Sequence, residues 1–424
     1  MSGPAGLLRR VVRVEPGEGS ALGWSFAYFF SLLAAWYVLR PVREEMGIQG
    51  GLERLPWAFT AVFLVMLAAV PAFSALVARV PRSRAIPAVY GFFLVNLLAF
   101  WALLGAGGGR PWLAGTFFVW ASVFNLFVVS VFWSYMADLW DPAQGKRLFG
   151  FISAGGSAGA VAGPALARLL VSAVGVRGLL LVAAGLLALA TLCAGRLSRW
   201  AHHARGGAAG SGAALGGGPF SGFAEVARSS YLLALAGHML LITSSGTVLY
   251  LLQQRLVAGA FQSPVERTAF FATVDLVVNV ASLAVQAFAT GPAFAALGVG
   301  VGLLLHPALS VVGLLAVAAS PTLGLVAALG GLRRVVHYGL ERPAREVLFT
   351  VLTREEKYKA KSFIDTVLYR AGDALGGWGW KALGGLGLAL SASALSALPL
   401  ALAWLAVAHY LRRRHAALEV ARRT

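Results

Sequence analysis

The chain has 424 residues, of which 58% are hydrophobic and 12% are charged, whereas soluble domains average about 45–50% apolar and about 25% charged residues. This composition excludes a water-soluble globular protein and a disordered chain. It indicates instead that the chain crosses a membrane several times, with roughly 20 residues in each crossing. The net charge is +18. We expect no nucleic-acid partner, because basic residues beside membrane helices orient those helices and contact anionic lipid.

Apolar runs separated by short polar, glycine or proline stretches predict twelve transmembrane helices and an all-α membrane protein. A glycine-rich stretch divides them and has the composition of a flexible linker. We therefore expect an N-terminal six-helix half at 1–195, a cytoplasmic linker at 196–228 and a C-terminal six-helix half at 229–424 with a basic tail. The predicted spans are 21–46, 55–79, 85–105, 112–139, 148–174, 177–195, 229–253, 268–289, 299–319, 322–352, 362–388 and 392–411.

The lysines and arginines outside these spans predict the orientation. With both termini in the cytoplasm, 21 of them lie on the cytoplasmic side and five on the opposite side. Cytoplasmic loops carry such an excess of positive charge. We expect a multi-pass protein of the bacterial cytoplasmic (inner) membrane, and no cleavable signal, because the first apolar run is long enough to span and ends in charge.

Apart from residues at the span ends, nine lysines and arginines nevertheless fall inside the predicted spans, and the acidic residues there include seven possible partners. A charge at the bilayer centre costs at least about 2.5–3.5 kcal/mol on insertion scales, so these side chains are expected to point into a bundle interior or an aqueous cavity. They are Arg40, Arg43, Arg168, Arg333, Arg334, Arg342, Arg345, Arg370, Lys381, Glu44, Glu45, Asp275, Glu341, Glu346, Asp365 and Asp373.

The tenth span concentrates this polarity in two neighbouring stripes. One stripe repeats every four residues, and the second is offset from it by one residue. A polar face of this kind on a membrane helix is expected to line a wet region. The stripes are Arg333, His337, Glu341 and Arg345, and Arg334, Tyr338, Arg342 and Glu346.

One short pattern occurs twice, as Arg40-Pro41-Val42-Arg43-Glu44 and as Arg342-Pro343-Ala344-Arg345-Glu346. Proline removes a backbone donor and frees carbonyl groups, and broken helices beside a cavity are where transporters bind substrate. Two arginines three residues apart share a helix face and are suited to bind phosphate or carboxylate. The alternative is that arginines and glutamates pair within or between helices and hold one conformation.

Signals for catalysis and metal binding are weak. Gly155-Gly156-Ser157-Ala158-Gly159 matches the G-x-S-x-G motif but lies inside an apolar helix, where Gly155, Gly159 and Gly163 instead form a small-residue stripe for close packing. His202-His203 lacks ligand spacing. We expect no enzyme activity, no metal and no cofactor.

Several segments resemble known transporters. Twelve spans in two halves look like the major facilitator superfamily. Tyr37 to Glu44, Gly145 to Gly150, Tyr338 to Val347 and Lys359 to Asp365 resemble, in order, segments of the bacterial and plastid nucleotide (ATP/ADP) transporter family. In that family lysines stand at the places of Arg43 and Arg345.

The sequence departs from that family in two respects. The family has acidic residues on spans four and seven, whereas residues 112–137 and 229–253 contain no Asp or Glu, and Tyr250 or Gln253 falls near the expected position on span seven. Both lysines are replaced by arginine, which binds phosphate differently. The resemblance therefore implies transport more strongly than ATP/ADP exchange.

The functional expectation is a secondary transporter that moves a small organic anion, with nucleotides and other phosphate esters among the candidates, by alternating access. The alternative is a transport-inactive membrane protein with an interaction or sensor role on the same fold. Substrate binding is assigned to Arg40, Arg43, Arg342, Arg345 and Tyr338. Counter-charge or proton coupling is assigned to Glu44, Asp275, Glu341, Glu346, Asp365, Arg370 and Asp373.

Overall fold

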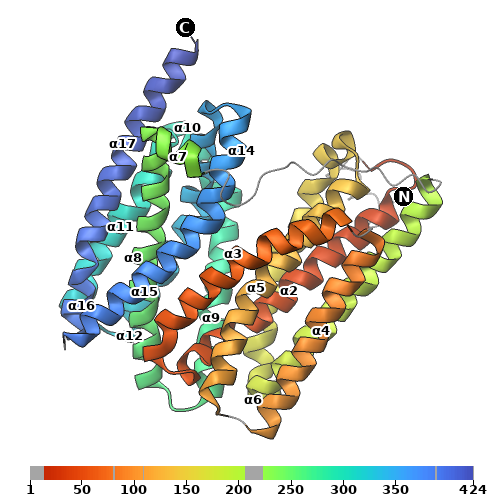
Figure 1. Ribbon diagram of the computed structural model, residues 1–424, viewed down its shortest axis with the longest axis horizontal. Coiled ribbons are helices and arrows are strands. Elements are labelled where there is room, and N and C mark those ends of the chain that lie inside the picture. The colour runs from red at the N-terminus through yellow and green to blue at the C-terminus, as the bar shows by residue number, and fades with distance from the viewer. Residues whose placement is uncertain (1–13, 80–81, 108, 206–222, 387–388, 424) are drawn as a thin grey trace. The chain divides into compact units, whose positions relative to one another are not determined.

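The computed structural model describes residues 14–79, 82–107, 109–205, 223–386 and 389–423, and every regular element in these ranges is helical (Figure 1). This confirms the all-α expectation. Most of the glycine-rich linker predicted at 196–228 lies outside the described residues. At its two ends the chain is helical, because α6 continues to Arg205 and a short helix, α7, covers Phe223–Arg228.

The chain forms two compact units. Unit 1 comprises Met1–Glu45, Phe73–Leu215 and Pro264–Leu276. Its described segments include most of α2, the end of α3, and all of α4, α5 and α6, together with the first part of α9. The helices that supply unit 1 are α2 (Gly19–Gln49), α3 (Leu55–Arg79), α4 (Arg82–Ala106), α5 (Pro111–Leu139), α6 (Pro142–Arg205) and α9 (Pro264–Ala284).

Unit 2 comprises Met46–Ala72, Gly216–Ser263 and Val277–Thr424. Within it, α8 (Ser230–Ala260) packs against α15 (Tyr369–Gly385) and α17 (Leu398–Arg423), and α11 (Gly300–Ala319) packs against α16 (Leu390–Ser396) and α17 (Figure 1). The other elements that lie wholly in unit 2 are η1 (Leu52–Arg54), α7 (Phe223–Arg228), η2 (Val285–Ala289), α10 (Thr290–Leu297), α12 (Leu323–Val336), η3 (His337–Glu341), α13 (Arg342–Leu348), η4 (Phe349–Val351), α14 (Arg354–Phe363) and η5 (Ile364–Leu368).

All twelve predicted spans coincide with helical stretches, although nine stretches of the described residues meet a criterion of length and hydropathy for crossing a membrane. One difference arises in α6, where two predicted spans join at Gly175, whose φ of 69° and ψ of 173° are not helical. The other two arise at 322–352 and 362–388, because charges and π-helical turns interrupt these segments.

Small residues allow α6 to pack directly on α2 in unit 1. A Cβ atom added to Gly159 would lie 2.3 Å from the carbonyl oxygen of Phe30, and one added to Gly155 would lie 2.5 Å from that of Phe26. At Gly163 the nearest atom would be the Cβ of Tyr37, at 2.6 Å. The predicted small-residue packing stripe is confirmed, because the two backbones approach too closely for larger side chains.

The start of α2 is tied to the start of α6 by a carboxylate. Glu18 is buried and accepts hydrogen bonds from Arg147 Nη1 and Nη2 at 3.0 and 2.9 Å, from Gln144 Nε2 at 2.9 Å, and from the Glu15 amide at 2.9 Å. Burial opposes the charged form, but these hydrogen bonds outweigh it and lower the pKa of Glu18. The ionised carboxylate is therefore the stable form in the folded protein.

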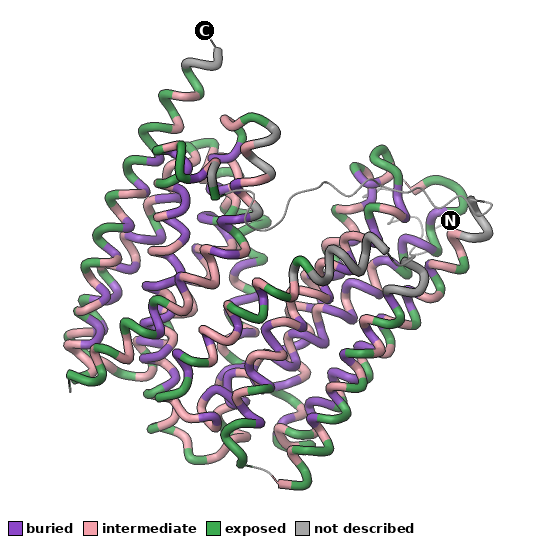
Figure 2. Tube along the Cα trace, viewed as in Figure 1, coloured by how far each residue is buried: buried purple, intermediate pink, exposed green. Residues whose placement is uncertain are grey.

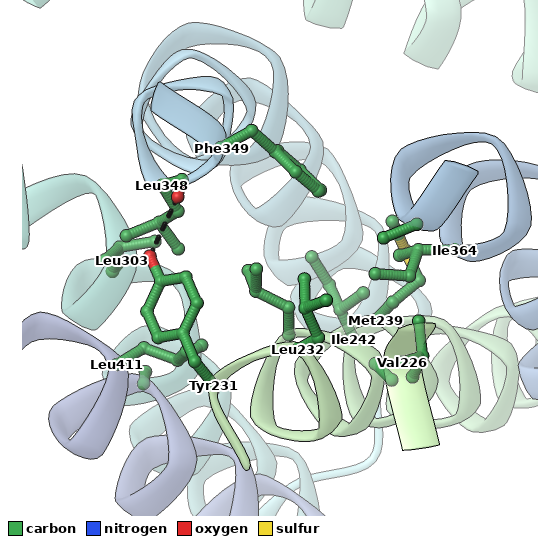
Figure 3. Close-up of a cluster of buried hydrophobic side chains, with 14 of the residues drawn as sticks. Val226, Tyr231, Leu232, Met239, Ile242, Leu303, Leu348, Phe349, Ile364 and Leu411 are labelled. Atoms are coloured by element: carbon green, nitrogen blue, oxygen red, sulfur yellow. Dashed lines mark hydrogen bonds between the residues drawn. The ribbon is translucent and has the colours of Figure 1, made fainter. Parts of the chain in front are cut away.

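An apolar core joins helices of unit 2 that are distant in sequence (Figure 3). It includes Leu232 and Met239 of α8, Leu303 of α11, and Ile364 at the start of η5. At one edge the hydroxyl of Tyr231 donates a 2.8 Å hydrogen bond to the carbonyl oxygen of Leu348, drawn as a dashed line in Figure 3. In both units, buried residues follow the faces of helices that meet other helices, as the purple stretches in Figure 2 show.

Candidate functional site

The predicted arginine of the first span, Arg43, contacts residues of α2 and α5 in unit 1. Its Nε donates a 3.1 Å hydrogen bond to Ser122 Oγ on α5, and its Nη1 lies 2.8 Å from Glu44 Oε1. The guanidinium carbon lies 3.8 Å from the centroid of the Phe118 ring, within the range of a cation–π contact. These contacts hold the guanidinium plane in one orientation.

Two further ion pairs connect α2 to the first part of α9, also within unit 1. Arg40 Nη1 lies 3.2 Å from Asp275 Oδ1. Arg267 forms a two-pronged pair with the fully buried Glu45, with Nε to Oε2 at 2.7 Å and Nη2 to Oε1 at 2.9 Å. Parallel hydrogen bonds of this kind are the strongest form of an arginine–carboxylate pair. Arg40 thus has a carboxylate partner from another helix, while Arg43 is matched by the carboxylate next to it in sequence.

The repeated Arg-Pro pattern has different consequences in the two places. Pro41 lies inside α2, which continues as an α-helix to Gln49. Pro343 is the second residue after a π-helical turn, η3, and cannot donate to the carbonyl of Gly339 four residues earlier. That carbonyl instead accepts a 2.6 Å hydrogen bond from Thr290 Oγ1. Short π-helical turns often occur at functional sites, and this one contains His337 and Glu341 of the polar stripe.

Glu341, at the end of η3, is fully buried in unit 2 and has three basic neighbours. His337 Nδ1 lies 2.8 Å from its Oε2, whereas His238 Nε2 of α8 and Arg345 Nε lie 3.1 and 3.5 Å from its Oε1. A buried carboxylate is tolerated only with such partners. Of the two polar stripes predicted in the tenth span, the one that contains Glu341 is the more buried. Its members are Arg333, His337, Glu341 and Arg345.

His238 is held in one tautomer by its other neighbour. The indole Nε1 of Trp404 on α17 donates a 3.0 Å hydrogen bond to His238 Nδ1. Because an indole nitrogen can only donate, Nδ1 must accept, and the ring proton of a neutral imidazole must be on Nε2. His238 consequently donates to Glu341 and orients one of its two oxygen atoms.

Arg345 lies between two carboxylates of unit 2. Its Nη1 is 3.1 Å from Asp365 Oδ1 and 3.4 Å from Met239 Sδ, while its Nε faces Glu341. The two partners differ in accessibility, since the side chain of Glu341 is 0% exposed and that of Asp365 is 34% exposed. Asp365 lies in a second π-helical turn, η5. Arg345 therefore has one fixed carboxylate partner and one that faces an accessible region.

The other predicted residues of unit 2 lie in separate environments. Arg342 is exposed, and Tyr338 is half-buried with its ring centroid 5.0 Å from that of His337. Glu346 pairs with Lys361 of α14. Arg370 pairs with Asp373 at 3.2 Å, and Asp373 also accepts a hydrogen bond from Thr247. Arg168 in unit 1 is exposed, so burial within a unit does not extend to all sixteen charges.

The sequence analysis does not identify two groups of residues that the structure places at or near the predicted site residues. Ser122 and Phe118, which hold Arg43, look like ordinary helix residues in the sequence. His238 and His306 are single histidines inside predicted apolar spans, and both are buried in unit 2. A search of the spans for histidine as well as for charged residues would have found them, because imidazole also needs polar partners inside a membrane protein.

Three solved structures that are similar to this chain are transporters. A bacterial homologue of the human lysosomal transporter Spinster, in an inward-facing and unoccupied conformation, matches with a TM-score of 0.56 and 16% identity, over 97% of this chain and 98% of that one. The nucleoside transporter NupG matches with a TM-score of 0.66 and 11% identity, over 94% and 99%. An inward-facing bacterial homologue of the iron transporter ferroportin matches with a TM-score of 0.60 and 15% identity, over 91% and 98%.

No protein-family model matches the sequence, and no curated protein sequence is significantly similar to it. The structural matches cover nearly the whole of each chain, and they confirm the predicted major-facilitator fold. Together with the apolar helices they identify a multi-pass membrane protein. The resemblance to ATP/ADP transporters remains a prediction.

Proposed function

We propose that this protein is a secondary transporter that moves a small organic anion across the membrane by alternating access. The fold and its likeness to transporters solved in inward-facing conformations support the transport cycle. In this class of protein, two bundles move largely as rigid bodies around a substrate site, so no soluble ATPase domain is required.

The observation that supports an anionic substrate is the excess of basic residues in the tenth and eleventh predicted spans. Residues 322–352 and 362–388 contain six basic and four acidic residues. One of the four, Glu346, is paired with Lys361, which lies outside these spans. An unbalanced positive charge inside a membrane bundle is costly, and an anionic substrate would neutralise it.

Arg345 is the residue of unit 2 to which we assign the anion. Glu341 is fully buried and held by two histidines, so it stays on the Nε side of the guanidinium. Asp365 is partly exposed and contacts Nη1. We propose that a substrate phosphate or carboxylate takes the place of Asp365 on Arg345, because exchanging one carboxylate partner for another anion leaves the buried charge compensated.

Arg43 is the corresponding residue of unit 1. Its guanidinium is oriented by Phe118 and Ser122 and is matched by the adjacent Glu44. Arg40 is engaged with Asp275 from another helix, so we assign it to the ion pairs between α2 and α9. Nucleotides, sugar phosphates and carboxylates are the candidate substrates, and the family resemblance at residues 37–44 and 338–347 favours nucleotides among them.

Ligand-induced thermal stabilisation of the purified protein in detergent tests this assignment. A substrate at about 100 times its dissociation constant adds ~2.7 kcal/mol to the free energy of unfolding, which raises the melting temperature by roughly 5–11 °C. We expect at least one nucleotide, sugar phosphate or carboxylate to produce this shift. Arg345→Gln should abolish it, whereas Arg413→Gln, on the exposed side of α17, should leave it unchanged.

Asp365→Asn provides the sharper result. If substrate displaces Asp365, removing its charge removes a competitor, and the variant should bind the anion more tightly than the wild type. Weaker binding by Asp365→Asn would show that this carboxylate supports the substrate instead. Stabilisation without transport would favour the alternative of a sensor or interaction protein.

A further inference from the structure

A group of three side chains in unit 2 has the composition of a metal site. His306 comes from α11, and His337 and Glu341 come from the π-helical turn η3. One potential ligand atom from each of the three lies within 4.8 Å of the others. The ring centroids of the two histidines are 5.7 Å apart. Two imidazoles and a carboxylate form a ligand set that zinc enzymes use, with further positions left for water or substrate.

His306 provides an independent sign that a ligand belongs here. Its side chain is buried, with a relative exposure of 3%. Neither ring nitrogen has a hydrogen-bond partner among the residues that the structure describes. Leaving a buried donor or acceptor unsatisfied costs about 1–3 kcal/mol per group. Its ring packs edge-on against Trp404 at a centroid distance of 4.6 Å, and this contact satisfies neither nitrogen.

The neighbours of Glu341 leave one of its oxygen atoms for a cation. Oε1 faces His238 Nε2 at 3.1 Å and Arg345 Nε at 3.5 Å. Oε2 faces only His337 Nδ1 among the ion-pair partners within the described residues, at 2.8 Å. His238, itself held by Trp404, fixes the carboxylate in the way that hydrogen-bonded partners orient metal ligands. Arg345 also pairs with Asp365. Its single positive charge therefore does not fully neutralise Glu341.

We propose that His306, His337 and Glu341 bind a divalent transition-metal ion of the zinc type. Ligand atoms around a tetrahedral zinc ion with bonds of about 2.0–2.1 Å are roughly 3.4 Å apart. To bind the ion, Glu341 Oε2 and His337 Nδ1 therefore move slightly apart, and a ring nitrogen of His306 moves closer to both. Mixed nitrogen and oxygen ligands favour zinc, nickel and cobalt over magnesium and calcium, which prefer oxygen ligands alone. The ion would join α11 to η3 beside Arg345.

Metal titration of the full-length protein, purified without a histidine tag and stripped with a chelator, tests the proposal. We expect one zinc ion per chain by isothermal titration calorimetry, no comparable binding of magnesium, and a visible absorption band when cobalt replaces zinc. His306→Ala and Glu341→Gln should each weaken zinc binding at least 100-fold. His238→Ala, which removes only an orienting partner, should weaken it by about 10–100-fold.

His409→Ala is the matched control, because His409 is exposed on α17 and should bind zinc as the wild type does. His306→Cys guards against a folding failure of the alanine variant, since a thiolate also binds zinc, and it should retain the ion and shift the cobalt spectrum. Wild-type zinc binding in His306→Ala, or the absence of saturable zinc binding in the wild type, would overturn the proposal.

Discussion

The buried pair between Glu45 and Arg267 offers a quantitative test of how α2 is held against α9. Glu45 is fully buried, and both of its oxygens accept hydrogen bonds from Arg267 at 2.7 and 2.9 Å. Glu45→Gln keeps the shape of the side chain but removes the carboxylate charge that faces the Arg267 guanidinium. Breaking a buried pair on one side costs about 3–5 kcal/mol. For a unit of about 150–250 residues, each kcal/mol lowers the melting temperature by roughly 2–4 °C.

We therefore expect Glu45→Gln to lower the melting temperature by about 6–20 °C, measured by tryptophan fluorescence of the purified protein in detergent. Glu15→Gln is the control, because the side chain of Glu15 is 69% exposed in its pair with Arg147, and an exposed pair contributes about 1 kcal/mol or less. The double variant Glu45→Gln with Arg267→Met should recover at least half of the loss, because both charges of the pair are then removed. Equal melting temperatures for the Glu45 and Glu15 variants would refute the reasoning.

Three further outcomes follow from particular contacts. Gly159→Val should destabilise the protein by about 1–3 kcal/mol or more, because a side chain there meets the backbone of α2. Gly150→Val is the control and should change the melting temperature far less, because a Cβ atom at that position meets nothing within 4 Å. Glu18→Gln should destabilise the protein above about pH 4.5, the ordinary pKa of the carboxyl. Because the folded-state pKa is lowered, the difference from the wild type should disappear as pH falls through that lowered value. Tyr231→Phe should cost about 1–3 kcal/mol, because it leaves a buried carbonyl oxygen without its donor, and a melting curve equal to that of the wild type would contradict this.

Much of the fold follows from local patterns in the sequence. Each apolar run of membrane-spanning length coincides with helix in the structure, because backbone groups in lipid must be satisfied within the segment. The stripe of Gly155, Gly159 and Gly163 correctly predicts a close helix contact, and Pro343 correctly marks a place where a carbonyl loses its helical donor. These signals lie within a few neighbouring residues.

Tertiary pairing is less accessible to sequence reasoning. The assignment of Met46–Ala72 to unit 2 and of Pro264–Leu276 to unit 1 depends on contacts between distant helices. The predicted halves at 1–195 and 229–424 follow chain order alone. Likewise, the sequence identifies Glu341 as a buried charge but contains no sign that His238 of another helix is its partner. The two π-helical turns η3 and η5 have no sequence signature beyond the nearby polar residues.

The central claim is that a small anion crosses the membrane through this protein with the help of Arg43 and Arg345, and flux in proteoliposomes tests it most directly. Vesicles are preloaded with an unlabelled anion that stabilises the purified protein, and entry of the labelled anion is followed. We predict saturable entry that internal substrate accelerates and that both Arg43→Ala and Arg345→Ala reduce at least 10-fold, with Arg413→Gln unchanged. Entry no faster than in protein-free vesicles, or wild-type entry in both alanine variants, would contradict the account.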